Sequence, residues 1–356
     1  GRVAGPGRVD VVKADGATVS LDTRNVIIAT GSKPVNLPIP GADLPGVFVS
    51  EAALDLEFVP RRLAVVGAGV IGVELACIFR SFGSEVVLLE KLPGILPPVD
   101  EEISRRLTAA LKRKGIAVNT GVSVEGISAD ADGSRRVYGR DQAGNPFQVG
   151  CDVVIVSVGR RPDFGGIDLD ALGVVYDRRG IKVDDNLQTN VQGIYAVGDV
   201  LGRTWLAHVA SHEGITAMRN IMGEKAVMRY DVVPACVFSS PELGWVGITE
   251  QEARTRGLQV KASRFPFSAN GRALILGEAD GMVKVLADED GRLLGVHILG
   301  PHADDLIHEA AAALELGATA GEMAEMIHSH PTLAEALAEA FLGVDGSPIH
   351  FATRRR

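Results

Sequence analysis

The hydrophobic pattern is clearest between residues 63 and 90, where two apolar runs flank a segment of helical period. The first run is Leu63–Val66, and the second ends at Glu90. Between them, apolar side chains recur at helical spacing as far as Phe82, and Gly83 follows as a stop. This order predicts a strand, a helix and a second strand, which together form a βαβ unit.

Further apolar runs predict strands and one helix on either side of this unit. Helical spacing, with acids first and bases last, predicts a helix over Asp100–Lys114. The continuous run Asp152–Val158 is typical of a strand that is covered on both faces of a sheet. The other expected strands are short: Val9–Val12, Thr18–Leu21, Asn25–Ser32, Ile116–Val118, Ser123–Ser128 and a hairpin over Val137–Val149.

The pattern changes along the second half of the chain. Residues 34–45, which contain four prolines, and residues 163–190 are expected to be linkers. A strand over residues 193–199 and a helix over Ala207–Met222 follow. From Tyr230 onward, separate strands and then helices predict an antiparallel sheet with helices packed on it. These strands are Val232–Phe238, Leu243–Val246, Val260–Phe265, Met282–Ala287 and Leu294–Leu299, and the helices are Ala303–Leu316, Gly321–Ile327 and Leu333–Leu342.

Composition narrows the possible classes of protein. The 356 residues are enough for two or three domains, and 46% apolar with 23% charged residues is typical of globular proteins. A net charge of −9 leaves no basic footprint, so neither nucleic acid nor an anionic membrane is an expected partner. The three cysteines, Cys77, Cys151 and Cys236, have neither metal-ligand nor redox spacing, so we expect core residues and a cytoplasmic protein.

The turn inside the βαβ unit carries the spacing of a dinucleotide-binding fingerprint. Gly67 permits a tight turn, Gly69 lets the backbone approach a pyrophosphate, and Gly72 lets the helix pack closely on the strand. Glu90 lies at the end of the second strand, where a carboxylate accepts hydrogen bonds from ribose hydroxyls. The alternative, a plain βαβ crossover, does not explain this combination. Because a carboxylate repels a 2′-phosphate, Glu90 favours NAD(H) over NADP(H).

A histidine near the end of the chain is a candidate acid–base residue. Pro331 keeps His330 out of helical geometry, so its ring projects from a loop just before a helix. Glu335 is placed to hold one ring nitrogen and leave the other free near neutral pH. In the alternative interpretation, Thr332 and Glu335 are only a capping box and His330 is an ordinary loop residue.

Other polar residues leave two interpretations open. Asp199 is either a plain residue at a strand end or a ligand for a sugar or ribityl hydroxyl. The pair Arg160-Arg161 meets a phosphate or is solvated, and we favour solvation. His208 and His212 have the i, i+4 spacing of metal ligands, but no third ligand is nearby in the sequence, so no metal site is expected.

Six motifs in a fixed order closely resemble the flavin-dependent pyridine nucleotide–disulfide oxidoreductases, and the dihydrolipoamide dehydrogenase group in particular. They cover essentially the whole chain. The motifs are ATGS at Ala29–Ser32, GAGVIGVE at Gly67–Glu74, VGRRP at Val158–Pro162, GIYAVGD at Gly193–Asp199, LAHVASHEG at Leu206–Gly214 and HPTLAE at His330–Glu335.

The resemblance implies an α/β fold with Rossmann-like FAD- and NAD(P)-binding domains and a C-terminal α+β dimerisation domain. The implied segments are 1–60 (FAD), 61–160 (NAD), 161–230 (FAD, second part) and 231–356 (dimerisation). The implied cofactors are FAD and NAD. The implied partners are a second copy of the chain and the lipoyl domains of 2-oxoacid dehydrogenase or glycine cleavage complexes.

The resemblance also assigns site residues by motif. His330 is implied to take a proton from a dithiol substrate in the partner subunit's active site, oriented by Glu335. Residues implied to contact NAD are Gly67, Ala68, Gly69, Val70, Ile71, Gly72, Val73, Glu74, Glu90, Val122 and Gly159. Residues implied to contact FAD are Thr30, Gly31, Ser32, Asp199, Trp205, Leu206, Ala207 and His208.

Two motifs of the family are absent from this sequence: a first GxGxxG for the FAD pyrophosphate and a CxxxxC redox disulfide. The expectation is therefore that the chain lacks an N-terminal segment of the family. The expected activity is oxidation of protein-bound dihydrolipoamide with NAD⁺ through a disulfide and FAD. The alternative is a non-catalytic fragment that binds NAD and dimerises.

Overall fold

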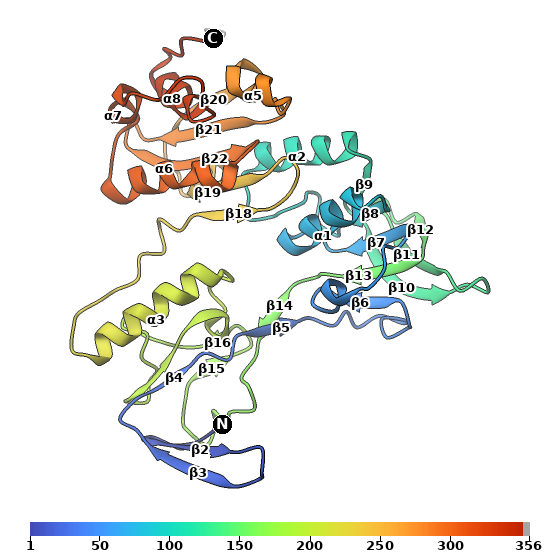
Figure 1. The fold of residues 1–356 in the computed structure, drawn as a ribbon, viewed down its shortest axis with the longest axis vertical. Coiled ribbons are helices and arrows are strands. Elements are labelled where there is room, and N and C mark those ends of the chain that lie inside the picture. The colour runs from blue at the N-terminus through green and yellow to red at the C-terminus, as the bar shows by residue number, and fades with distance from the viewer. Residues whose placement is uncertain (352–356) are drawn as a thin grey trace. The chain divides into compact units, whose positions relative to one another are not determined.

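The computed structural model describes residues 1–351 and has a mixed α/β fold. It divides into two compact units (Figure 1). Unit 1 contains Gly1–Val35 and Gly159–Tyr230, and unit 2 contains Asn36–Val158 and the chain from Asp231 onward. The last five residues of the predicted dimerisation segment, 352–356, lie outside the described part. Within residues 1–351, no helix combines the length and the apolar character that a membrane crossing requires.

The predicted βαβ unit is present in unit 2, as β7 (Arg62–Val66), α1 (Val70–Ser81) and β8 (Glu85–Leu89). It belongs to a five-stranded sheet with the order β6-β13-β7-β8-β9, in which all neighbours are parallel. The remaining strands of this sheet are β6 (Val47–Val49), β9 (Ile116–Asn119) and β13 (Val153–Val156). Every residue of β13 is buried, as predicted from its continuous apolar run.

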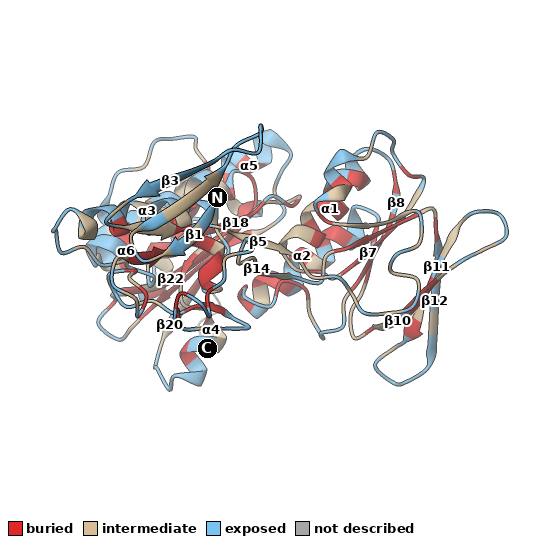
Figure 2. Cartoon of the chain, turned by 90° about the horizontal axis from the view of Figure 1, so that it is seen from below, coloured by how far each residue is buried: buried red, intermediate tan, exposed pale blue. Residues whose placement is uncertain are grey.

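The two faces of this sheet are covered by different elements. On one face, residues such as Val65 and Ile155 pack with α1 and α2 (Glu101–Arg113). On the other face, Val66 and Val154 pack with a three-stranded antiparallel sheet. The sheet strands are accordingly drawn largely as buried in Figure 2. The covering strands are β10 (Ser123–Ala129), β11 (Arg135–Arg140) and β12 (Pro146–Cys151), which include the predicted hairpin.

The second part of unit 2 is the predicted antiparallel sheet with helices on it. Its strand order is β18-β19-β22-β21-β20, and the residues of α6, α7 and α8 share its hydrophobic core. The strands are β18 (Ala235–Val237), β19 (Leu243–Gly247), β20 (Lys261–Pro266), β21 (Met282–Ala287) and β22 (Leu293–Leu299). The helices are α4 (Glu250–Thr255), α5 (Gly271–Leu276), α6 (Ala303–Leu316), α7 (Ala320–Glu325) and α8 (Glu335–Leu342).

Unit 1 is built from short strands around α3 (Ala207–Ile221). It contains a three-stranded meander, a parallel pair and two antiparallel pairs. The strands are β1 (Arg2–Gly5), β2 (Arg8–Val12), β3 (Thr18–Asp22), β4 (Val26–Ile28), β5 (Ser32–Pro34), β14 (Arg160–Pro162), β15 (Tyr176–Asp177), β16 (Gly180–Ile181) and β17 (Ile194–Ala196).

The expected linker over residues 163–190 is a wrong prediction. This segment contains β15 and β16, and Leu169, Leu172 and Leu187 are buried in the core of unit 1. Its many turn residues and acids concealed an apolar pattern whose period is neither helical nor strand-like. Its leucines pack in one hydrophobic core with residues of α3 and β17.

A buried ion cluster joins the two parts of unit 2. The Lys284 ammonium on β21 is 1% exposed and lies 2.8 Å from both Asp100 oxygens and 2.6 Å from Glu250 Oε2. Asp100 is also the N-cap of α2, and Arg264 bridges Glu102 and Glu250. Burial opposes ionisation of Asp100, but the bonds from Lys284 outweigh it and lower the pKa of that carboxyl. The cluster therefore fixes the start of α2 to the antiparallel sheet.

Replacing Lys284 with Met is expected to lower the free energy of unfolding by about 3–5 kcal/mol at neutral pH, because three carboxylates then face one another without the ammonium. The matched control is Lys261→Met, which breaks an exposed pair with Asp345 and is expected to cost less than about 1 kcal/mol. Denaturant unfolding of both variants measures the difference.

The same comparison at low pH tests the cause. The pKa values of Asp100, Glu102 and Glu250 are all lowered, so the stabilisation is fully present above their ordinary pKa values of about 4 and is lost as the pH falls further. The gap between wild type and Lys284→Met should therefore narrow below about pH 4. An unchanged gap at that pH would contradict the electrostatic explanation.

Candidate functional site

The glycine turn of unit 2 has the backbone that the fingerprint predicts. Gly67 has a φ of +101°, and a Cβ there would lie 2.4 Å from the carbonyl oxygen of Ser157. A Cβ on Gly72 would lie 1.9 Å from the oxygen of Gly67. A Cβ on Gly69, in contrast, would meet no atom within 4 Å. Gly67 and Gly72 are thus required by close packing, whereas Gly69 faces open space at the start of α1.

The start of α1 offers backbone donors to an anion. Gly69 is the N-cap and no side chain caps the helix. The N–H groups of the first turn, at Val70, Ile71 and Gly72, therefore point out of the helix end, where the helix dipole favours negative charge. The Val73 N–H instead closes the first turn on the Gly69 oxygen, at 3.0 Å.

Glu90 lies against the same turn. Its Oε2 accepts from the Ala68 N–H at 2.7 Å, and its Oε1 accepts from the Leu92 N–H at 2.8 Å. Its own carbonyl oxygen accepts from the Val122 N–H at 2.8 Å. Ala68, Glu90 and Val122 are therefore brought together, as the motif match implies.

Three further residues differ from what the motif match implies. Ser157, which the sequence analysis missed, donates to the Gly67 oxygen at 3.0 Å and closes the turn from the neighbouring strand. Glu74 points to the antiparallel sheet, where it accepts from the Phe238 N–H at 2.9 Å, and burial raises the pKa of its carboxyl. Gly159, with a φ of +121°, belongs to unit 1, where its carbonyl accepts from the Val35 N–H.

In unit 1, a second group of predicted residues lies beyond two parallel strands. Because β4 and β17 run parallel, their carboxyl ends lie at one edge. There the Ser32 hydroxyl donates to Asp199 Oδ2 at 2.5 Å, and Arg160 Nε donates to Ser32 Oγ at 2.7 Å. Asp199 lies in a 3₁₀ turn, Gly198–Leu201, rather than in the strand itself.

The preferred interpretation of Arg160 as a solvated side chain is therefore wrong. Its guanidinium is tied to both the hydroxyl and the carbonyl of Ser32. The sequence could not show this, because residues 32 and 160 meet only when β5 pairs with β14.

Thr30 and the residues at the start of α3 are further predicted residues of unit 1. Thr30 Oγ1 is buried and has no hydrogen-bond partner among residues 1–351, so it is an unused polar atom. Leu206 is the N-cap of α3 without a capping side chain, and Trp205, Ala207 and His208 are exposed.

Glu213 is a further residue that the sequence analysis missed. It is buried and accepts from the Gly198 N–H at 2.6 Å, next to Asp199. It also accepts from the Tyr230 hydroxyl at 2.7 Å, and burial, together with Glu213, raises the pKa of Tyr230 to about 12. An acid on the buried face of a predicted helix is the sequence signal for such a residue, because a buried carboxylate needs specific hydrogen-bond donors.

The His330–Glu335 contact is present in unit 2. His330 Nδ1 lies 2.9 Å from Glu335 Oε1, and the Thr332 N–H donates to Glu335 Oε2 at 2.8 Å. Burial raises the pKa of Glu335, but the Thr332 N–H and His330 outweigh it, so the pKa is lowered overall. Since a carboxylate only accepts, Nδ1 carries the hydrogen and Nε2 is left for acid–base work. The His330 side chain is 80% exposed.

The expected capping box at Thr332 forms only in part. The Thr332 hydroxyl donates to the Ser329 oxygen instead of capping α8, which begins at Glu335 with Ala334 as N-cap. The loop is held by His328, whose side chain is 6% exposed and whose two ring nitrogens contact the Met326 oxygen and Glu309 Oε1, each at 3.0 Å.

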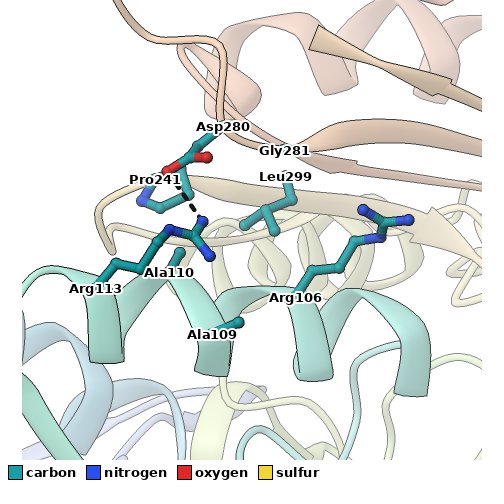
Figure 3. A pocket seen from close by; sticks show the side chains of 8 residues that line it. All are labelled: Arg106, Ala109, Ala110, Arg113, Pro241, Asp280, Gly281 and Leu299. Carbon is teal, nitrogen blue, oxygen red and sulfur yellow. Dashed lines mark ion pairs between the residues drawn. The ribbon is translucent and has the colours of Figure 1, made fainter. Parts of the chain in front are cut away.

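Other hollows and clusters of unit 2 do not contain the predicted residues. Figure 3 shows a cavity of about 180 Å³ between α2 and the antiparallel sheet, where Arg113 pairs with Asp280 at 3.0 Å. At the start of α6, His302, Asp304 and Asp305 bring possible metal-ligand atoms within 4.8 Å of one another. Such surface groups are common without an ion, and we assign no metal to them.

The fold and these sites define a nucleotide-binding protein with a separate sheet-and-helix part that carries a histidine–glutamate pair. Residues 2–214 match the model of the pyridine nucleotide-disulphide oxidoreductase family, and residues 233–341 match the dimerisation domain of that family. The chain belongs to the pyridine nucleotide-disulphide oxidoreductases.

Similar proteins and structures agree. The chain is 42% identical to a dihydrolipoyl dehydrogenase of Bacillus subtilis, over 97% of this chain and 74% of that protein. It is 39% identical to the mitochondrial dihydrolipoyl dehydrogenase of mouse, over 99% of this chain and 70% of that protein. Among solved structures, LpdA of Mycobacterium tuberculosis has a TM-score of 0.85 at 26% identity, covering 95% of this chain and 74% of LpdA. The flavoprotein disulfide reductase RclA of Escherichia coli has a TM-score of 0.86 at 27% identity, covering 96% and 77%.

These matches confirm four of the predictions made from the sequence. They are the family, the α/β fold class with Rossmann-like and dimerisation domains, the class of NAD-dependent flavin oxidoreductase, and the cofactors FAD and NAD. The match to a dimerisation domain supports a homodimer.

Replacing Gly69 with Ala is expected to weaken NADH binding by at least tenfold while leaving the melting temperature unchanged. The Ala methyl fits the protein, because nothing lies within 4 Å, but it occupies the space through which a pyrophosphate approaches the helix end. NADH fluorescence titration and thermal unfolding measure the two effects. The matched variant Gly72→Ala should instead lower the melting temperature, because its Cβ would lie 1.9 Å from a backbone oxygen. Unchanged NADH affinity in Gly69→Ala would contradict the assignment.

Proposed function

We propose that this protein oxidises dihydrolipoamide carried on lipoyl domains and passes the electrons to NAD⁺. The observation that carries the proposal is the His330–Glu335 pair, with its 2.9 Å contact, in a chain of this family. Dihydrolipoyl dehydrogenases are also the named relatives at about 40% identity over nearly the whole chain. This reaction needs a base for a thiol proton, and His330 is suited to that role.

His330 acts in this proposal as the acid–base residue, and Glu335 orients it. The carboxylate holds the Nδ1–H, so that Nε2 is the nitrogen that takes the thiol proton. A nearby negative charge also stabilises the imidazolium that forms. The Thr332 N–H fixes the second carboxylate oxygen, which keeps Glu335 in place while the proton moves.

The glycine turn and Glu90 are proposed to hold NAD. The N–H groups at the start of α1 would face the pyrophosphate, with Gly69 providing the open approach. Glu90 would accept from the ribose hydroxyls. The other residues proposed to surround the nucleotide are Ala68, Val73, Glu74, Val122 and Gly159.

FAD would be held by the polar edge of unit 1. The residues present fit a ribityl chain or a phosphate, because Asp199 is held by Ser32 and the Thr30 hydroxyl is buried without a partner. When bound, FAD supplies the transfer of electrons between a thiol–disulfide pair and NAD. The start of α3, residues 205–208, offers a further set of contacts.

The remaining assignments complete the proposal. Unit 1, residues 1–35 and 159–230, would form the FAD part, and residues 36–158 would form the NAD part. The boundary predicted at residue 60 is moved because β6 (Val47–Val49) pairs with β13 in the five-stranded sheet. Residues 231–356 would form the interface of a two-fold dimer in which His330 serves the partner subunit. The names of the relatives support lipoyl domains as protein partners. The three free cysteines support a cytoplasmic location.

Replacing His330 with Gln is expected to lower kcat for dihydrolipoamide oxidation by roughly 100-fold or more, because the general base is removed. The visible spectrum of bound flavin and the dimer mass should not change. Steady-state assays of the FAD-loaded enzyme with NAD⁺ test this. A wild-type protein that dimerises and binds NADH, but does not oxidise dihydrolipoamide when loaded with FAD, would favour the non-catalytic alternative.

The wild-type enzyme is expected to use NAD⁺ at least tenfold better than NADP⁺ by kcat/KM, and Glu90→Ala should narrow this ratio. The carboxylate repels a 2′-phosphate, and its removal also takes away the acceptor for the ribose hydroxyls. Equal use of both nucleotides by the wild type would contradict the role given to Glu90.

A further inference from the structure

The same helix, α8, carries the carboxylates of two histidine–glutamate pairs. His350 Nδ1 lies 2.7 Å from Glu339 Oε1, and Glu339 follows Glu335 by four residues on α8. Residues four apart lie on one face of a helix, one turn from each other. The two carboxylates of α8 therefore stand in a row, and each contacts the Nδ1 of one imidazole.

The second pair is held from several directions. Glu339 is only 5% exposed, and its other oxygen accepts from the N–H groups of Ile349 at 2.8 Å and His350 at 3.1 Å. The ring of Phe351 packs edge-on against Phe265, with centroids 6.2 Å apart. A carboxylate buried to this degree is costly unless donors satisfy it, and here three donors do so. His350 is thus fixed by a built arrangement, although it lies close to the end of the chain.

The geometry prepares His350 in the same way as His330. The carboxylate at Nδ1 holds the hydrogen there, so a neutral ring presents an unprotonated Nε2. The His350 side chain is 70% exposed, so this nitrogen can exchange protons with water.

The two pairs also interact electrostatically. Burial raises the pKa of Glu335, but the Thr332 N–H, His330 and, more weakly, the charge of His350 lower it overall. A positive charge on His350 therefore stabilises the ionised form of Glu335, the carboxylate that orients His330.

We propose that His350 is the proton-exit group of the acid–base site, taking the proton that His330 receives from the substrate and passing it to water. The inference rests on the function proposed above. That reaction converts a dithiol and NAD⁺ into a disulfide, NADH and one proton, and this proton has to pass from His330 to water. His350 acts through His330 and does not itself touch the substrate.

The proton balance of the transfer is simple. The S–H bond of the substrate breaks as an N–H bond forms at Nε2 of His330. That N–H bond then breaks, and the proton moves through solvent water to form an N–H bond at Nε2 of His350. Water or a buffer base finally removes it. One proton moves throughout, and no electrons are transferred in these steps.

The test replaces His350 with Gln in the FAD-loaded enzyme. The Gln amide can still donate to Glu339, but it takes up no proton. In weak buffer, kcat for dihydrolipoamide oxidation should fall several-fold, which is less than the roughly 100-fold loss expected for a direct acid–base group. The KM for dihydrolipoamide should not change, and added imidazole should restore kcat. The matched control is His308→Gln on α6, which should behave as wild type in every buffer.

Two results would overturn the inference. One is a kcat equal to that of wild type at every buffer concentration. The other is a loss that imidazole does not restore, which would mean a structural role. If thermal unfolding shows that His350→Gln does not fold, His350→Asn is assayed with the same readouts. A wild-type enzyme without dihydrolipoamide activity would contradict the proposed function as well. An active wild type, with a His350→Gln variant whose kcat equals that of wild type at every buffer concentration, would contradict only this inference.

Discussion

The buried ammonium of Lys284 is the interaction on which the arrangement of unit 2 depends. One charge from the antiparallel sheet meets Asp100, which caps α2, and Glu250, which opens α4. His297, the register partner of Lys284 on β22, is fully buried, and burial lowers the pKa of its imidazole. His297 therefore adds no second positive charge beside the Lys284 ammonium and its carboxylates. The nucleotide turn and the histidine pairs are carried by the two parts that this cluster joins.

The two proposed nucleotide sites have the same physical arrangement, although they lie in different units. In each unit, parallel strands end at one edge, and a helix begins there without a capping side chain. Such a helix end provides unpaired N–H groups, and a nearby carboxylate can accept from sugar hydroxyls. Glu90 has that position in unit 2 and Asp199 in unit 1. The proposed binding of a dinucleotide in each unit therefore depends on the direction of the parallel strands and on one acid near their ends.

Local patterns predicted much of the fold. The βαβ unit, the helix over Asp100–Lys114 and the antiparallel strands all agree with the structure, because each depends on residues close in sequence. The segment 163–190 was mistaken for a linker because its few apolar residues follow no regular period. The capping box offered as the alternative for Thr332 and Glu335 forms in part: the Thr332 N–H donates to Glu335, but the Thr332 hydroxyl donates to Ser329.

Local sequence is enough to identify the residues that need a special backbone, such as Gly67 and Gly72, and the spacing that places Glu335 within reach of His330. Which distant side chains meet depends on the packing of the folded chain: Arg160 with Ser32, Ser157 with Gly67, Lys284 with Asp100 and His350 with Glu339. The difference arises from the range of each interaction. Backbone conformation and helix caps act over a few residues, whereas a buried charge or hydroxyl takes its partner from whichever strand or helix packs beside it.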